Sequence, residues 1–238
     1  MSNKIKAILG SIYLIILTTF LYLIFSEFDV DRINDFSYYK ELRINIEQLI
    51  GQNLYLNLII FFTFSMIWVV LLGFGSPILI LSGIIFGKWI GTFISLISIS
   101  TGSLCLYIIG KYFFSDLIHQ ILKKKFNKFI ERFQKNEFYY FLAFRAAGGL
   151  GIPFGLQNLL PVIFNIKNFN YFFASLFGFI PHFFIWNSVG AGINEYIKVS
   201  DEFSLLMLIM SEEVYIPLIT FVVLFLFSLF IKKKFFND

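Results

Sequence analysis

The sequence has little of what soluble enzymes and metalloproteins are built from. It contains one cysteine, Cys105, and two histidines among 238 residues, which excludes a disulfide framework and a cysteine-based metal site. Charged residues make up 14% of the chain, against about 25% in soluble domains. Hydrolase signatures and a phosphate-binding loop are also missing. We therefore predict a protein that is not an enzyme and carries no metal or other cofactor.

The sequence is rich in hydrophobic residues and contains long apolar segments. Hydrophobic residues account for 58% of the chain, 34 residues are Phe, and the mean hydropathy is +0.79. The blocks 54–110 and 138–192 contain no Asp or Glu, and their only charges are Lys88, Arg145 and Lys167. Such composition predicts an all-α integral membrane protein, because a membrane span needs about 20 apolar residues in a helix.

The remaining charges fall into five polar stretches that alternate in sign. These stretches are 1–7 (positive), 26–53 (negative), 111–137 (positive), 193–213 (negative) and the tail after Ile231 (positive). Lys and Arg concentrate on the cytoplasmic side of membranes. We therefore predict cytoplasmic N- and C-termini and two external acidic loops. Single spanning helices are expected at 7–25, 91–112, 169–192 and 213–231.

Two apolar segments do not fit a single span. Residues 54–90 are interrupted at Gly73, Gly75 and Pro77, and residues 138–167 at Gly148, Gly149, Gly151 and Pro153. Gly and Pro both break helices. The charge pattern requires each segment to begin and end on the same face of the membrane. This predicts two re-entrant hairpins from opposite faces, lining a cavity near the midplane, since irregular backbone survives there only when it is shielded from lipid.

The two halves have matching spacing. Pro77 lies 25 residues before Gly102, and Pro153 lies 25 residues before Gly178. Inverted repeats of broken segments are common in secondary transporters. The predicted architecture is an inverted repeat of hairpin 54–90 with helix 91–112 and hairpin 138–167 with helix 169–192, joined by the basic amphipathic segment 113–137. This core of 54–192 is flanked by an anchor helix and acidic loop in 1–53, and by an acidic loop and spanning helix in 193–238.

The residues of this core resemble one family. In the first half these are Gly75-Ser-Pro77, Ser82-Gly83, Phe86-Gly87, Gly91, Gly102 and Tyr107-Ile-Ile-Gly110-Lys111; in the second, Phe144-Arg145, Pro153-Phe154, Asn158, Gly178-Phe-Ile-Pro181 and Gly190. The pattern is similar to the DedA family, also called the VTT-domain or SNARE-associated Golgi protein superfamily, in a bacterial branch near the yeast Golgi vesicle proteins. The resemblance implies a multi-pass protein of the bacterial inner membrane with paired re-entrant hairpins. It also implies movement of lipids between leaflets, as a scramblase or flippase would.

The sequence departs from the proton-linked members of that family. Those carry acids near the first hairpin and usually two arginines near the second, whereas here 54–110 lacks acids and Arg145 stands alone. This favours passive exchange over proton-driven transport. Glu47 and His182 are the candidate titrating residues if coupling exists. A coupled transporter of a small solute and a non-transporting scaffold that recruits partners therefore stay open as alternatives.

Arg145 and Asn158 are the candidate residues of the substrate path. A guanidinium binds phosphate through two hydrogen bonds, so Arg145 is expected either to bind a lipid headgroup or to cap the hairpin carbonyls. Asn158 is expected to hydrogen-bond across the hairpin or to face the cavity. Small or helix-breaking residues are expected to let the helices pack closely, namely Gly83, Gly87, Gly91, Gly102, Gly178, Pro181 and Gly190.

The basic segment suggests a second membrane contact. Lys123, Lys124 and Lys125 precede apolar residues at helical spacing, which is typical of an amphipathic helix on an anionic leaflet. Anionic lipid headgroups are therefore the expected partners, together with membrane lipids in general. Assembly into a homo-oligomer also stays open, and nucleic acid is not an expected partner.

Overall fold

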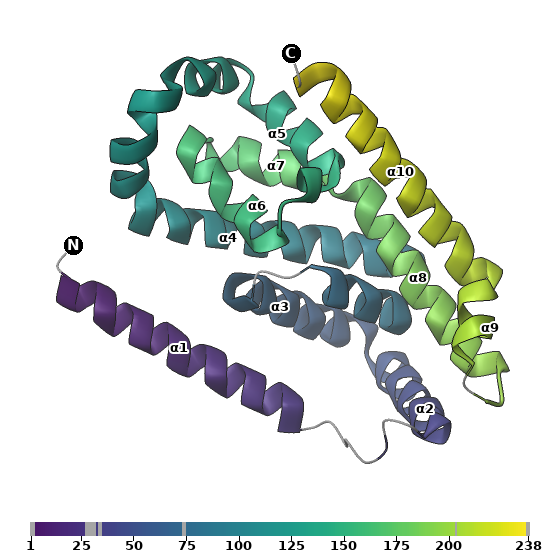
Figure 1. Ribbon diagram of the computed structural model, residues 1–238. Helices are drawn as coiled ribbons and strands as arrows, with labels where there is room; N and C mark the ends of the chain where they lie inside the picture. The colour runs from purple at the N-terminus through teal and green to yellow at the C-terminus, as the bar shows by residue number, and fades with distance from the viewer. Residues whose placement is uncertain (1–2, 27–31, 33–34, 73–74, 203, 237–238) are drawn as a thin grey trace.

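The computed structural model describes residues 3–26, 32, 35–72, 75–202 and 204–236, with no strand among them (Figure 1). The helices are α1 (Asn3–Ser26), α2 (Phe36–Gln52), α3 (Leu54–Leu72), α4 (Ser76–Lys135), α5 (Glu137–Ala146), η2 (Gly148–Gly151), α6 (Phe154–Leu159), η3 (Leu160–Phe164), α7 (Asn168–Gly178), α8 (Ile180–Val199), α9 (Leu205–Met210) and α10 (Glu212–Phe236). Gly73 lies outside the described residues, and so do the side chains of Lys123, Lys124 and Lys125.

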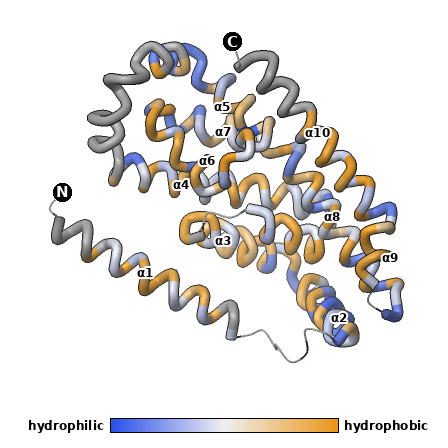
Figure 2. The backbone as a smooth tube through the Cα atoms, viewed as in Figure 1, coloured by the Kyte–Doolittle hydropathy of each residue, from blue (hydrophilic) through white to orange (hydrophobic). Residues whose placement is uncertain are grey.

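Length and hydropathy mark candidate membrane spans within the described residues. Leu54–Leu71 and Ser76–Phe113 are each long and apolar enough to cross a membrane, and the pair α7–α8 adds a third if it forms one bent span. Figure 2 shows apolar backbone through α3, α4, α7 and α8, with hydrophilic residues concentrated on α2 and near the ends of the long helices. These apolar helices indicate that the chain is a membrane protein.

The first broken segment folds into a helical hairpin. Phe61 on α3 and Phe86 on α4 stand at similar distances in sequence before and after the break, and their ring centroids are 5.3 Å apart, so the segment folds back on itself. The chain then reverses again, because Ser82 Oγ donates to the carbonyl of Gly91 at 3.0 Å. In a straight helix nine residues would span about 13 Å. The reversal centres on Gly87, whose φ of 74° is a left-handed conformation that favours glycine.

The second broken segment also folds back on itself. The carboxylate of Glu137 accepts hydrogen bonds from Lys167 N at 3.3 Å and from Asn170 Nδ2 at 2.6 Å, which ties the two ends of the segment together. Closer to the break, Arg145 on α5 donates to Asn158 on α6 at 2.7 Å. In the view of Figure 1, α5, α6 and α7 gather above α4, while α3 lies below it.

The two breaks meet. A Cβ placed on Gly75, at the first break, would lie 3.7 Å from the ring of Phe154, which begins α6 after the second break. Phe154 in turn packs against Phe179, with ring centroids 5.7 Å apart. Phe179 belongs to a buried apolar cluster that also contains Ile78 and Phe183, and Phe154 packs against this cluster. The contact between hairpins is therefore part of the molecule's core.

The expected span at 169–192 is not one straight helix. It consists of α7 and α8, which are bent by 47° around Phe179. Pro181 stands in the first turn of α8. Proline has no N–H to donate and its ring collides with the preceding turn, so it ends one helix and begins another. By contrast, the expected span at 91–112 lies within α4, which continues without an assigned break to Lys135.

The first acidic stretch is largely helical, although the sequence pattern predicted a loop. Its helix α2 begins with Asp35 accepting a hydrogen bond from Ser37 N at 2.9 Å. Lys40 on α2 forms an ion pair with Asp201 at 3.3 Å. The ring of Phe36 lies 6.3 Å from that of Tyr196. The two acidic stretches therefore lie at the same end of the molecule.

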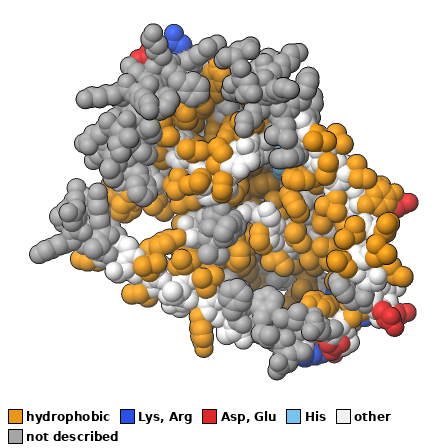
Figure 3. Space-filling model, viewed as in Figure 1, with side chains coloured by type: hydrophobic (Ala, Val, Ile, Leu, Met, Phe, Trp, Pro, Cys, Tyr) orange, Lys and Arg blue, Asp and Glu red, His pale blue; other side chains and the backbone are white. Residues whose placement is uncertain are grey.

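The surface matches a lipid environment. Large apolar side chains are exposed on α1, α3, α4 and α10, including Tyr55, Ile59, Phe93, Ile219 and Val223. Figure 3 shows hydrophobic side chains across much of the visible face, with the visible acidic and basic side chains near its periphery. Apolar patches of this extent mark surfaces that are covered by membrane or partners.

Candidate functional site

Arg145 is the most deeply buried charge among the described residues. It lies in the last turn of α5, one turn before the second break, and its exposed fraction is 1%. Burying a cation in an apolar interior is costly unless hydrogen bonds or an opposite charge compensate it. No ion pair to Arg145 is present within the described part of the chain. The compensation must therefore come from neutral groups.

Neutral oxygen atoms supply that compensation. The Arg145 guanidinium donates to Asn158 Oδ1 at 2.7 Å, to Tyr171 Oη at 2.9 Å and to Gln157 Oε1 at 3.4 Å, and its Nε donates to Ser175 Oγ at 3.3 Å. These partners come from α6 and α7, so the guanidinium joins three helices. We call these five residues the Arg145 cluster.

Aromatic rings surround the same guanidinium. Its carbon lies 4.7 Å from the ring centroids of both Phe141 and Phe179, and 5.5 Å from that of Tyr171. The electron-rich face of an aromatic ring attracts a cation and contributes more when water is excluded. Gly178 permits this arrangement, because a Cβ there would lie 2.5 Å from the Arg145 side chain. The positive charge is thus stabilised without being neutralised.

Asn158 belongs to the cluster through only one end of its side chain. Its Oδ1 accepts from Arg145, while its Nδ2 is buried without a hydrogen-bond partner. An unpaired buried donor costs about 1–3 kcal/mol. The Asn158 carbonyl also accepts from Tyr171 Oη at 3.2 Å. Asn158 therefore bridges the hairpin arms and retains one unused donor beside the buried cation.

The backbone at the second break depends on glycine. Gly148, Gly149 and Gly151 have φ values of 67°, 69° and 81°, in the left-handed region that other residues seldom adopt. Gln157 holds this turn by donating to the Ile152 carbonyl at 2.6 Å and to the Gly148 carbonyl at 3.3 Å. The break and the Arg145 cluster therefore share Gln157, and Pro153 immediately precedes α6.

The two candidate titrating residues lie apart. His182 is beside the second break, where a Cβ on Gly148 would lie 2.6 Å from His182 Nε2, and its Nδ1 is buried without a partner. Glu47 lies on α2 and forms an ion pair with Arg43. Glu47 is therefore outside the Arg145 cluster, and only His182 adjoins a hairpin break.

Several of the predicted packing residues lie at close helix crossings. A Cβ on Gly83 would lie 2.1 Å from the Asn187 carbonyl oxygen, and one on Gly190 would lie 2.1 Å from that of Ile80. Gly91 and Gly102 likewise face α8 and α3, with hypothetical Cβ contacts of 2.6 and 2.9 Å. The packing prediction for Gly87 is wrong. Nothing lies within 4 Å of its added Cβ, and its positive φ makes it a turn residue.

Sequence reasoning did not single out Gln157, Tyr171 or Ser175. A signal for two of them was present, since Tyr171, Ser175 and Gly178 follow helical spacing in an otherwise apolar helix. Residues four apart share one helix face. Gln157 adjoins Asn158, but only the three-dimensional fold shows that its amide holds the break.

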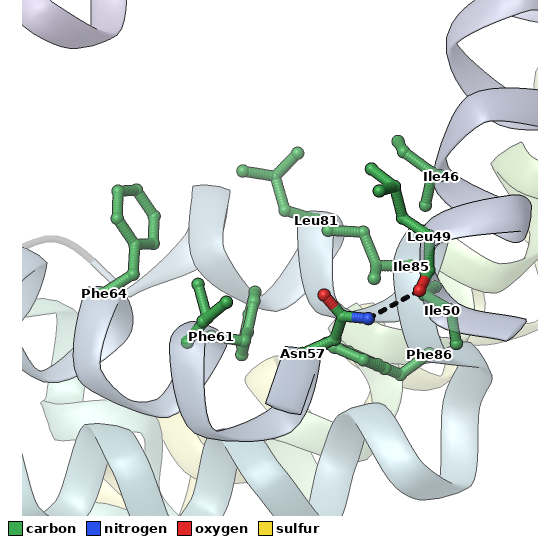
Figure 4. A pocket seen from close by; sticks show the side chains of 10 residues that line it. Ile46, Leu49, Ile50, Asn57, Phe61, Phe64, Leu81, Ile85 and Phe86 are labelled. Atoms are coloured by element: carbon green, nitrogen blue, oxygen red, sulfur yellow. Dashed lines mark hydrogen bonds between the residues drawn. The ribbon is translucent and has the colours of Figure 1, made fainter. Parts of the chain in front are cut away.

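An apolar cavity of about 240 Å³ lies beside the first hairpin (Figure 4). Ile46, Leu49 and Ile50 of α2 form one side, and Phe61 of α3 and Leu81 of α4 contribute to the other. Asn57 is the polar residue in this lining, and its Nδ2 donates to the Leu49 carbonyl at 2.8 Å. The cavity suits a hydrocarbon group better than a charged solute.

Comparison with protein families agrees with this architecture. A family model described as the VTT domain matches residues 57–192, which include both hairpins and the Arg145 cluster. No solved structure matches the chain. The match covers more than half of the sequence and confirms the resemblance seen in its glycine and proline pattern. The chain belongs to the DedA/VTT superfamily of membrane proteins.

Proposed function

We propose that the protein moves phospholipid, or another amphipathic anion, between the leaflets of the inner membrane. The observation that carries this proposal is the Arg145 guanidinium, buried without an acidic partner next to the contact between two hairpin breaks. A buried cation held only by neutral groups attracts an anion more strongly than a salt-bridged one would. The lipid phosphate is the anion that a membrane supplies.

Arg145 and Asn158 would bind the lipid phosphate transiently, by exchanging their present hydrogen-bond partners for the phosphate oxygens. Phosphate oxygens form stronger, charge-assisted hydrogen bonds than the neutral oxygens of Asn158 and Tyr171. The unused Nδ2 of Asn158 offers a further donor. A transient binding site requires that the guanidinium exchange its hydrogen-bond partners while it keeps its positive charge. Breaks from opposite faces would shorten the distance that the headgroup travels through an apolar environment.

The acyl chains would remain in apolar surroundings during this movement. The exposed apolar surface and the apolar cavity beside the first hairpin support that part of the proposal. The shared location of the two acidic stretches supports placing them together outside, with the termini and the Lys123–Lys125 segment at the cytoplasmic surface. Anionic headgroups there would contact the basic segment. The absence of acids from 54–110 favours passive exchange.

A coupled mechanism is the second candidate, and His182 is the observation that favours it. Its imidazole lies beside Gly148 and has one unpartnered buried nitrogen. Histidine is the side chain that most readily changes charge near neutral pH. Coupled transport would stop in a His182→Gln variant under an imposed pH gradient, whereas passive exchange would continue.

The decisive experiment reconstitutes the purified protein into liposomes with fluorescent lipids and follows leaflet-selective quenching. We expect Arg145→Lys to fold but to move lipid at least about tenfold more slowly, because a lysine cannot reproduce the planar, multidentate guanidinium contacts. Lys167→Gln is the matched control, since it removes an exposed charge from the same apolar block. Wild-type rates in folded Arg145→Lys and Arg145→Gln proteins would refute the proposed path.

A further inference from the structure

A second cavity, of about 490 Å³, lies between α8, α10 and the turn of α4. Its floor includes Ser188, Ala191 and Gly192, which share one face of α8. Small side chains leave this helix surface open. Unlike the apolar cavity beside the first hairpin, this one is lined by residues of both charge signs.

The positive charge is that of Lys88, which follows the reversal at Gly87. Its neighbour Trp89 packs on Phe184 of α8, with ring centroids 5.0 Å apart. The Lys88 backbone carbonyl accepts from Thr92 Oγ1 at 2.5 Å, a bond within the helix that follows the turn. Lys88 is therefore attached to the cavity by a constrained segment, although its side chain is exposed.

The negative charges are those of Glu212 and Glu213, in the first turn of α10. This turn packs on the far end of the same α8 face, because a Cβ on Gly192 would lie 2.6 Å from the Glu213 carbonyl oxygen. Phe184 and Gly192 are eight residues apart, about 12 Å along a helix. The segment that carries Lys88 and the turn that carries Glu212 and Glu213 therefore contact opposite ends of this α8 face.

These opposite charges do not neutralise one another. Among the described residues, neither Glu212 nor Glu213 forms an ion pair with Lys88. A ligand that carries both a negative and a positive group would complement both ends of such a cavity. Phosphodiester headgroups that bear an ammonium group have this charge pattern, whereas purely anionic headgroups leave the two carboxylates unpaired.

We propose that this cavity is a binding site for the zwitterionic headgroup of a phospholipid such as phosphatidylethanolamine. Lys88 contacts the phosphate, Glu212 and Glu213 contact the ammonium, and the small residues of α8 accommodate the linking atoms. The inference rests on the proposed lipid movement and deepens it by naming the headgroup class. Because the cavity lies at the same end as the acidic stretches, it serves the external leaflet in the proposed topology.

Binding tests this site separately from transport. Short-chain phosphatidylethanolamine and phosphatidylglycerol are titrated into the detergent-purified protein, with Trp fluorescence as the readout because Trp89 lies beside the cavity residue Phe184. We expect wild type to bind phosphatidylethanolamine about fivefold or more tightly than phosphatidylglycerol, the size expected from an exposed charge pair. Calorimetry provides a second measurement that does not depend on Trp89.

Charge variants complete the test. Glu212→Gln with Glu213→Gln should abolish the preference by weakening phosphatidylethanolamine binding about fivefold, and Lys88→Gln should weaken binding of both lipids. Glu195→Gln and Lys198→Gln are matched controls, because those residues pair with each other on α8 and do not line the cavity. Equal binding of both lipids by wild type, or an unchanged preference in the double variant, would overturn the site. Absence of lipid movement in wild-type liposomes would instead overturn the proposed function.

Discussion

The two hairpins have the same outline but use different chemistry. The first consists of regular helix on both sides of its break, and its buried polar groups are hydroxyls such as those of Ser65 and Ser82. The second has a short α5, left-handed backbone at the break itself and the buried charge of Arg145. This difference suggests that close packing stabilises the first hairpin, whereas a polar network organises the second and provides the proposed chemistry.

The largest expected effect comes from breaking the packing of the first hairpin. Gly83→Leu would force a side chain into the Asn187 backbone, whose oxygen lies 2.1 Å from the added Cβ position. Overpacking typically costs about 1–3 kcal/mol, and a collision with backbone belongs at or above the upper end. We expect little monodisperse protein in size-exclusion chromatography. Gly51→Leu is the control because nothing lies within 4 Å of its Cβ; equal losses in both variants would contradict the packing role.

A smaller, more selective effect is expected in the second hairpin. Tyr171→Phe removes the hydroxyl that accepts from Arg145 at 2.9 Å. Hydrogen bonds to charged groups contribute about 1.5–3 kcal/mol, so we expect a lower thermal midpoint and lipid movement about tenfold slower.

Tyr107→Phe provides an internal control for that variant. The rings of Tyr107 and Tyr171 stack with centroids 4.5 Å apart, but the Tyr107 hydroxyl donates to the Ile166 carbonyl at 2.6 Å. Loss of this bond should lower stability while lipid movement stays near wild type. If both variants slowed transport equally, general weakening of the hairpin would explain the result, and the special role of the Arg145 cluster would be refuted.

A substitution at the Gly87 reversal, where the first hairpin segment ends, should have a modest effect on thermal stability. Ser82→Ala removes the hydrogen bond to the Gly91 carbonyl that closes the reversal. We expect a cost of about 1 kcal/mol, measured as a lower midpoint of thermal unfolding in detergent. Ser100→Ala, by contrast, removes a buried hydroxyl without a partner and should be neutral or stabilising. The reverse order of the two midpoints would show that the Ser82 bond does not stabilise the turn.

The sequence predicted the general fold because helix breaks and apolar length are local properties. Pro77 and Pro153 indicated where the apolar segments fold back, and the structure shows a reversal at each break. The family and the helical membrane class are confirmed. Entry of the hairpins from opposite faces depends on where the bilayer lies and stays a prediction, and so does the inverted repeat.

The residues that surround Arg145 were harder to predict from the sequence. The lack of acids near Arg145 in the chain indicated a cation with unusual partners, yet Tyr171 and Ser175 lie 26 and 30 residues away from it. Only packing of α7 against α5 brings them together. Gly87 illustrates the opposite error, because its regular spacing suggested a packing stripe while the chain uses its left-handed φ to turn.

The smallest expected effect tests whether the second hairpin carries backbone strain. Leu150 has φ 55° and ψ 34°, a conformation that costs a residue with a side chain about 1–2 kcal/mol. Glycine removes that cost but adds about 0.5–1 kcal/mol of unfolded-state entropy, so Leu150→Gly should raise stability by up to about 1 kcal/mol. Leu156→Gly makes the same change at a largely exposed position in α6 and should lower stability by about 1 kcal/mol. Opposite shifts of the thermal midpoint would locate the strain at the second break, whereas parallel decreases would mean that the Leu150 side chain contributes more than its backbone costs.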